Sequence, residues 1–316
     1  MNYVVILIDG GAPSFCYYER GLKKVEISMA NLKKAIEYCH KNQLFATVVY
    51  PEYKLEQAKQ KILDNFEHIR ILPLSRVSDI MEGDILTIDY NPEIEQFKNI
   101  PINSYLNLIL RLKMSQIRDL EMIYYNFRNR FARISVILTD METTDEDSMN
   151  RYRIDLSKVK DYIFRGWNID LEFQINIITD RITLREMNNC NAGVTHFTIA
   201  PNGKFYICPG FYINNPKQNI GSFSEEIKIP NFNLLDISHS PICSVCDCYH
   251  CKRCVFLNKK MTFELNTPSH QQCVISHHER NQSGILLEKL HKRNILRNIP
   301  KIAPLFYLDP IETVFD

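Results

Sequence analysis

Short apolar runs alternate with amphipathic segments along the first 180 residues. Apolar runs typical of strands buried on both faces occur at Tyr3–Ile8, Phe45–Tyr50, Ile69–Leu72, Asp84–Asp89, Ile134–Leu138 and Leu171–Ile178. Between them, the spacing of apolar residues predicts helices at Met29–Lys41, Leu55–Phe66, Ser104–Met114, Ser115–Asn129 and Asp155–Arg165. Strands separated by helices of this length predict an α/β fold of repeated βα units with a mostly parallel sheet. Periodicity does not distinguish a partial (β/α) barrel from an open sheet.

The character of the chain changes after Thr179, where helical periodicity fades and turn residues become frequent. Asn202-Gly203, between the apolar runs Thr198–Ala200 and Lys204–Ile207, predicts a β-hairpin. A last helix is expected at about Ser283–Asn294. We therefore predict an α/β domain in residues 1–185, a small Cys-rich domain with a C-terminal helix in residues 186–294, and a packed tail in residues 295–316.

Composition and charge narrow the possible partners. Of the 316 residues, 45% are hydrophobic, and 38 Lys+Arg against 37 Asp+Glu give a net charge of +1. This balance does not support nucleic acid or a membrane surface as a partner. No apolar stretch approaches the roughly 20 residues that span a bilayer, and the opening run lacks the features of a secretory signal. The sequence thus predicts a cytoplasmic protein whose ten cysteines are not structural disulfides.

Eight of the ten cysteines crowd between Cys190 and Cys273, which points to metal ligation. The densest run contains two C-x2-C pairs and reads Cys243-Ser-Val-Cys246-Asp-Cys248-Tyr-His-Cys251-Lys-Arg-Cys254. Zinc is the metal most commonly bound by such pairs, but zinc ribbons usually separate the two pairs by roughly 12 to 20 residues. Iron–sulfur clusters are often held by a local run of cysteines plus a remote one. The spacing therefore favours iron–sulfur clusters and keeps zinc as the alternative.

The order of the cysteines resembles a known cluster-binding module. It reads C-x12-G-x4-C, a gap, C-x2-C-x4-C-x2-C, a second gap, and a final cysteine, with Gly203 as the glycine. Over about Asn188 to Ser276 this resembles the SPASM domain of radical S-adenosylmethionine enzymes that modify peptides, although two spacings of the central run are one residue shorter than usual. The resemblance implies two [4Fe–4S] clusters. It assigns Cys243, Cys246, Cys251 and Cys273 to the first, and Cys190, Cys208 and Cys254 to the second, whose fourth site is open or filled by Cys248.

The amino-terminal part lacks the loop that starts radical chemistry. Such enzymes carry C-x3-C-x2-C after their first strand, whereas the loop Asp9–Glu19 holds Cys16 alone. No S-adenosylmethionine cluster is therefore expected. This combination, with the runs Ser14–Glu19, Cys251–Asn258 and Ser276–Arg280, resembles the CXXX-repeat peptide maturase family. Members of that family occur with short peptides bearing cysteine at every fourth residue and with a separate radical enzyme.

The resemblance implies an iron–sulfur cluster-binding component of a ribosomal peptide modification system. Residues 1–185 would then be a degenerate radical-SAM-like domain, and the partners would be a Cys-repeat precursor peptide and a radical SAM peptide maturase. The chain is not expected to be a self-sufficient radical enzyme. The alternative is a zinc-binding structural or adaptor protein without redox function.

Three further side chains could belong to a site. Cys16 is interpreted as a buried or incidental thiol in preference to a ligand. His277 and His278, beside Glu279, could bind metal or transfer protons, or could pack against the cluster module.

Overall fold

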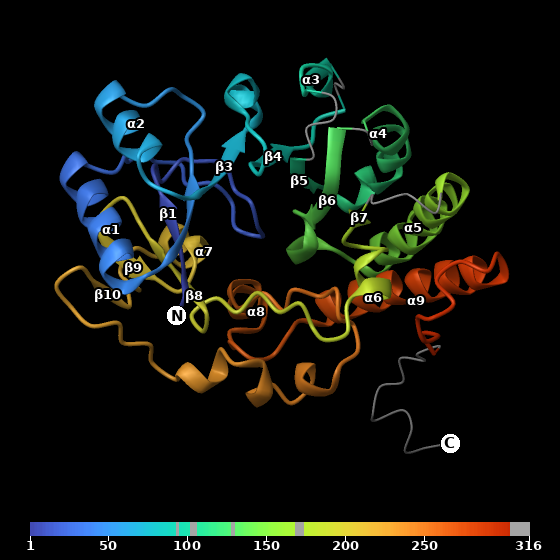
Figure 1. Ribbon diagram of the computed structural model, residues 1–316. Coiled ribbons are helices and arrows are strands. Elements are labelled where there is room, and N and C mark those ends of the chain that lie inside the picture. The colour runs from blue at the N-terminus through green and yellow to red at the C-terminus, as the bar shows by residue number, and fades with distance from the viewer. Residues whose placement is uncertain (93–94, 102–105, 128–129, 168–173, 304–316) are drawn as a thin grey trace.

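One ten-stranded sheet, in the order β10-β9-β8-β1-β2-β3-β4-β5-β6-β7, runs through the protein (Figure 1). The computed structural model describes residues 1–92, 95–101, 106–127, 130–167 and 174–303. Pairing is parallel from β8 through β7 and antiparallel from β8 to β10, which confirms the predicted mostly parallel α/β fold. The strands are β1 (Tyr3–Leu7), β2 (Phe45–Val49), β3 (Ile69–Pro73), β4 (Ile85–Asp89), β5 (Leu106–Leu112), β6 (Phe131–Leu138), β7 (Gln174–Ile175), β8 (His196–Ile199), β9 (Lys204–Tyr206) and β10 (Gly221–Ser222).

Helices flank this sheet on two sides. Because β1 to β6 are neighbours in chain order and their crossovers share one hand, the connecting helices lie along one side of the sheet. Figure 1 shows α1 to α5 there, while the orange and red segment carrying α8 and α9 closes the lower side. The helices are α1 (Met29–Asn42), α2 (Gln57–Asp64), α3 (Glu95–Lys98), α4 (Leu120–Phe127), α5 (Glu146–Gly166), α6 (Asp180–Thr183), α7 (Pro209–Asn214), α8 (Val255–Thr262) and α9 (His270–Lys292). Within the described ranges, none has both the length and the apolar surface that crossing a membrane requires.

The sheet continues past residue 185 into the Cys-rich region. Strand β8 pairs in parallel with β1, with Tyr3 opposite His196. The predicted hairpin then follows, since β8 and β9 pair antiparallel around Asn202-Gly203 and Gly203 adopts a φ of +76°. A positive φ of this size is the reason that glycine suits the turn. The first part of the Cys-rich region is therefore built onto the edge of the α/β sheet, next to β1.

The helix predicted at Ser104–Met114 is wrong where the structure describes it. Leu106–Leu112 forms β5, which lies between β4 and β6 in the sheet, while Ser104 and Tyr105 lie outside the described residues. Its leucines Leu106, Leu108, Leu110 and Leu112 are all buried, and Asn107 is exposed. Apolar residues at every second position have the period of a strand. Because both faces of the strand are covered, Ile109 is apolar as well, and the alternation is hard to recognise in the sequence.

Other bounds also differ from those predicted. A short 3-10 helix, Met114–Asp119, precedes α4 within the predicted helix Ser115–Asn129, whose last two residues lie outside the described part. Of the strand predicted at Leu171–Ile178, Gln174–Ile175 is β7, residues 176–178 form a turn, and residues 171–173 are not described.

The C-terminal helix starts earlier than predicted. Helix α9 begins at His270 because Ser269 caps it, accepting a hydrogen bond from the Gln272 amide while the Gln272 side chain accepts from the Ser269 amide. Beyond α9, Ile302 is buried and the Ala303 carbonyl accepts a hydrogen bond from Arg280 at 2.8 Å. Residues 304–316 of the predicted tail lie outside the described part.

Candidate metal centres

The four cysteines predicted for the first cluster come from neighbouring segments. Cys243 begins a 3-10 helix that ends just before Cys246, Cys251 lies in the next loop, and Cys273 sits in the first turns of α9. Burial first, and then the charges of Cys243 and Cys246, raise the pKa of Cys251 to about 11 and that of Cys273 to about 12. Charge effects of this kind act over a limited range, so the four thiols lie in the same part of the protein.

Cys248 lies with this first set. The Sγ atoms of Cys246 and Cys248 and a ring nitrogen of His277 all lie within 4.8 Å of one another. A hydrogen bond from the Cys248 thiol, acting first among several causes, lowers the pKa of Cys246 to about 4 and raises the pKa of Cys248 itself. His277 follows Cys273 by one turn of α9, which places both on one helix face. Cys248, predicted as a possible fourth ligand of the second cluster, therefore stands beside the first.

Two carboxylates join the cysteine run to the helices around it. Asp247 accepts a two-pronged hydrogen bond from Arg280 of α9, at 2.6 and 2.5 Å, and a third bond from Arg181 of α6 at 2.9 Å. Glu279 accepts from the Tyr152 hydroxyl of α5 at 2.6 Å and lies 3.1 Å from His250 Nε2. Paired charges of this kind fix the orientation of both partners. The loop between Cys246 and Cys251 is thus tied to three helices.

The three cysteines predicted for the second cluster meet around a small enclosed cavity of about 40 Å³. Cys208 directly precedes α7, Cys254 directly precedes α8, and the Cys190 amide donates to the Lys252 carbonyl at 2.8 Å. Burial raises the pKa of Cys190 to about 12 and also raises the pKa of Cys208. A metal cation beside a buried thiol stabilises the negatively charged thiolate. The thiol then loses its proton and binds the metal as a ligand.

Cys16 supplies a fourth sulfur to the wall of this cavity. Its Sγ shares a hydrogen bond with Cys254 Sγ, which lowers the pKa of Cys16 and raises that of Cys254. The charge of Cys16 also acts on Cys190 and Cys208. From the sequence, Cys16 is interpreted as a buried or incidental thiol, because nothing in its spacing links it to cysteines 170 or more residues away. Cys16 lies in the loop after β1, and ligand sites of α/β sheets occur at the carboxyl ends of strands. This position is the sequence feature that could have indicated a ligand.

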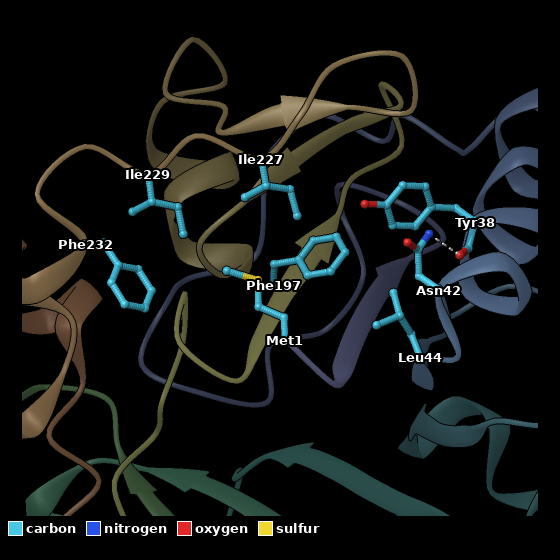
Figure 2. Close-up of a pocket in the computed structure, with 8 residues that line it drawn as sticks. All are labelled: Met1, Tyr38, Asn42, Leu44, Phe197, Ile227, Ile229 and Phe232. Atoms are coloured by element: carbon cyan, nitrogen blue, oxygen red, sulfur yellow. Dashed lines mark hydrogen bonds between the residues drawn. The ribbon is translucent and has the colours of Figure 1, made fainter.

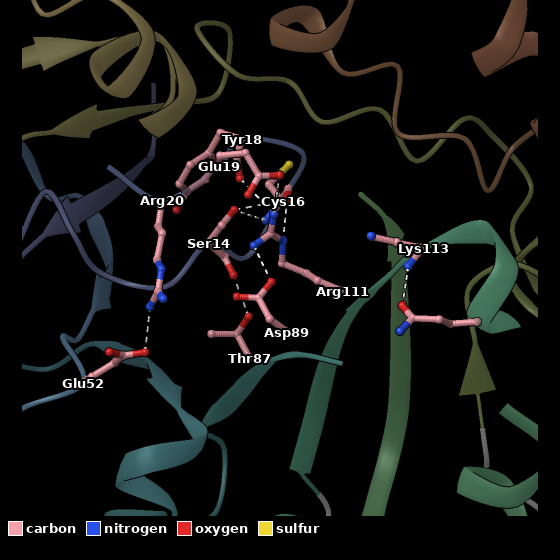
Figure 3. Close-up of polar contacts among 11 residues, drawn as sticks. Ser14, Cys16, Tyr18, Glu19, Arg20, Glu52, Thr87, Asp89, Arg111 and Lys113 are labelled. Atoms are coloured by element: carbon pink, nitrogen blue, oxygen red, sulfur yellow. Dashed lines mark hydrogen bonds and ion pairs between the residues drawn. The ribbon is translucent and has the colours of Figure 1, made fainter. Parts of the chain in front are cut away.

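Arg111 of β5 holds the Cys16 loop (Figure 3). Its guanidinium is only 2% exposed and donates to the carbonyls of Cys16, at 3.1 Å, and Tyr18, at 3.2 Å. It also pairs with Asp89 at 2.7 Å. Figure 3 shows the Cys16 sulfur on the side of the loop that faces away from Arg111. The arginine therefore fixes the backbone and leaves the thiol directed elsewhere.

The tenth cysteine takes no part in either set. Cys39 lies on the inner face of α1 and is 1% exposed, and burial raises its pKa to about 12. It packs in the hydrophobic core, as its helical spacing predicts.

Two of the larger cavities in the described part of the chain are large enough for a small ligand. One, of about 490 Å³, lies near Met1 and has mainly apolar walls, including Phe197, Ile227 and Phe232 (Figure 2). No Cys, His, Asp or Glu lines it. The other, of about 640 Å³, shares the side chains of Tyr18 and Phe256 with the wall of the cysteine cavity. We call this second one the Tyr18 groove; its remaining lining includes Arg20, Leu22, Lys23, Asn202, Tyr212 and Lys260.

Comparison with models of known protein families finds no match to this chain, and comparison with curated proteins finds none either.

Proposed function

We propose that this protein is the iron–sulfur cluster-binding component of a ribosomal peptide modification system. In this proposal it acts on a Cys-repeat precursor peptide, together with a radical SAM peptide maturase. The observation that carries the proposal is the placement of cysteines in two groups: Cys16, Cys190, Cys208 and Cys254 line one enclosed cavity, whereas Cys246 and Cys248 lie beside His277. One structural metal ion takes about four protein ligands, so a single ion would not account for two such groups.

The spacing of the sulfurs supports clusters. A single tetrahedral zinc, with Zn–S bonds of about 2.3 Å, needs sulfurs about 3.8 Å apart. Among the described residues, the trio of Cys246, Cys248 and His277 alone brings three ligand atoms within 4.8 Å of one another. The sulfurs around the Cys254 cavity are spread more widely, which suits a cluster whose separate irons each take one thiolate.

The Tyr18 groove supports a peptide as the substrate. Its volume of about 640 Å³ can hold several side chains, and it lies against the wall of a candidate cluster site. Leu22 on its lining is fully exposed, at 102%. Arg20, Lys23 and Asn202 add donors suited to peptide carbonyls. The proposal places the precursor in this groove.

Peptide binding tests the proposal. We expect the anaerobically purified protein to bind a fluorescent synthetic peptide with cysteine at every fourth residue, and Leu22→Asp to weaken that binding at least about tenfold by placing a charge in an apolar contact. Met81→Asp is the matched control, because Met81 is also exposed, at 61%, and does not line the groove. Equal binding by the two variants, or no binding by the unmodified protein, would contradict the proposed function.

A zinc-binding structural or adaptor role is the second candidate. The compact trio of Cys246, Cys248 and His277 favours it, because mixed sulfur and imidazole ligands at this spacing suit one zinc ion. The two candidates predict different metals in the purified protein.

A further inference from the structure

We propose that Cys16 is the fourth protein ligand of the metal centre held by Cys190, Cys208 and Cys254. The inference rests on the proposed metal-binding function and deepens it. In this arrangement one centre joins the loop after β1 to the C-terminal cysteine region. The assignment differs from the one that the resemblance to the SPASM domain implies, in which the fourth position is open or belongs to Cys248.

The geometry of the cavity selects Cys16. Cys16 lines the same enclosed cavity as Cys190, Cys208 and Cys254. Cys248 is instead engaged with Cys246, in the other group. His196 also lines the cavity, but its imidazole is a harder ligand than a thiolate. Among the side chains of this wall, a fourth soft ligand is therefore available only from Cys16.

Hydrogen bonds from three elements hold the loop that carries Cys16. Ser14 Oγ accepts from the Cys16 amide at 3.2 Å and donates to the Cys16 carbonyl at 3.1 Å, while Thr87 of β4 donates to the Ser14 carbonyl at 2.7 Å. Arg111 holds the Cys16 carbonyl from the adjacent strand. Ligands of preformed metal sites are oriented by hydrogen bonds of this kind. We assign Arg111 as a positioning residue for the ligand.

The assignment has a consequence for substrate chemistry. Four protein thiolates complete the coordination of this centre, so a cysteine of the precursor peptide would find no free position there. The centre would instead fix the first βα loop, whose Tyr18, Glu19 and Arg20 line the Tyr18 groove. Loss of the metal should then alter the groove as well as the Cys-rich region.

Metal content and electron paramagnetic resonance of single variants test the assignment. In the anaerobically prepared protein, Cys16→Ala should lose the metal of one centre, or shift the resonance of one reduced cluster, as Cys208→Ala does. The signal that Cys273→Ala removes should stay unchanged. Cys39→Ala and His196→Asn are the matched controls, because Cys39 lies in the core and His196 lines the same cavity. Both controls should retain all the metal.

The inference fails if Cys16→Ala keeps the full metal content and both signals while Cys208→Ala does not. Failure of the proposed function gives a different result, in which the unmodified protein contains no iron. Zinc in its place would still allow the ligand to be identified, since Cys16→Ala must then lose as much zinc as Cys208→Ala. Native thiol alkylation adds a readout in either case. Cys16 should be protected in the metal-loaded protein and react after chelation together with Cys190 and Cys208.

Discussion

Chelating the bound metal is expected to unfold residues 223–254 while β1 to β6 stay folded. This segment, which the structure describes throughout, joins β10 to α8 and its regular structure consists of three 3-10 helices of three residues each. Leu235 is buried, but Phe232, Ile242 and Val245 are exposed by 42%, 52% and 85%. The segment therefore buries too little apolar surface to offset the entropy of ordering it.

Bonds to metal would supply the missing stability. Structural metal ions contribute apparent free energies of about 10–16 kcal/mol to small cysteine-rich folds, because the unfolded chain has no preformed site. After metal removal, amide hydrogen exchange in residues 223–254 should therefore accelerate at least about 100-fold, since local opening would cost little free energy. Peptides from β2 and β4 serve as internal controls and should exchange at an unchanged rate. Equal protection of residues 223–254 with and without metal would contradict a structural role for the centres.

Replacing Arg111 with methionine is expected to lower the free energy of unfolding by about 3 kcal/mol. The variant leaves the carbonyls of Cys16 and Tyr18 without their donor and removes the partner of Asp89. Methionine keeps much of the buried volume, so the loss reports mainly on polar pairing and not on a cavity. The loop would also release Cys16, and the centre at the Cys254 cavity should lose metal.

Arg20→Met is the matched control for this prediction. Arg20 pairs with Glu52 at 2.9 Å, but the two side chains are exposed by 52% and 50%. An exposed pair contributes less than about 1 kcal/mol, because water and salt screen it. Urea unfolding and metal analysis of the two variants provide the comparison. Equal effects from Arg111→Met and Arg20→Met would show that the buried arginine does not position the cysteine loop.

The elements that could be predicted from the sequence are those specified by residues close together in the chain, such as a helix cap or a turn. The helix at Met29–Lys41 follows from the Ser28 cap and a buried stripe containing Leu32, Ala35 and Cys39, and all of these features occur in α1. The Asn202-Gly203 hairpin follows from turn chemistry. Strand β5 could not be predicted in this way, because burial on both faces obscures the alternation that distinguishes a strand from a helix.

The two candidate centres differ in the same way, because one consists mainly of residues close in the sequence and the other of residues far apart. The grouping of Cys243, Cys246, Cys251 and Cys273 was implied by the resemblance to the SPASM domain, and three of the four lie within nine residues. The place of Cys16 depends instead on the parallel pairing of β1 with β8, which brings the loop after β1 beside Cys190 and Cys208. That pairing joins residues almost 200 positions apart in the sequence, and no local pattern records it. The resemblance left the fourth position of the second cluster open or filled by Cys248, whereas the structure places Cys248 beside Cys246 and His277.

Metal and acid-labile sulfide per chain, measured on protein purified without oxygen, test the central claim most directly. Two [4Fe–4S] clusters predict about eight iron atoms and eight sulfides per chain, with a brown colour that dithionite bleaches. Stoichiometric zinc without sulfide and without visible absorption would contradict the cluster-binding function and leave the zinc-binding structural role in its place.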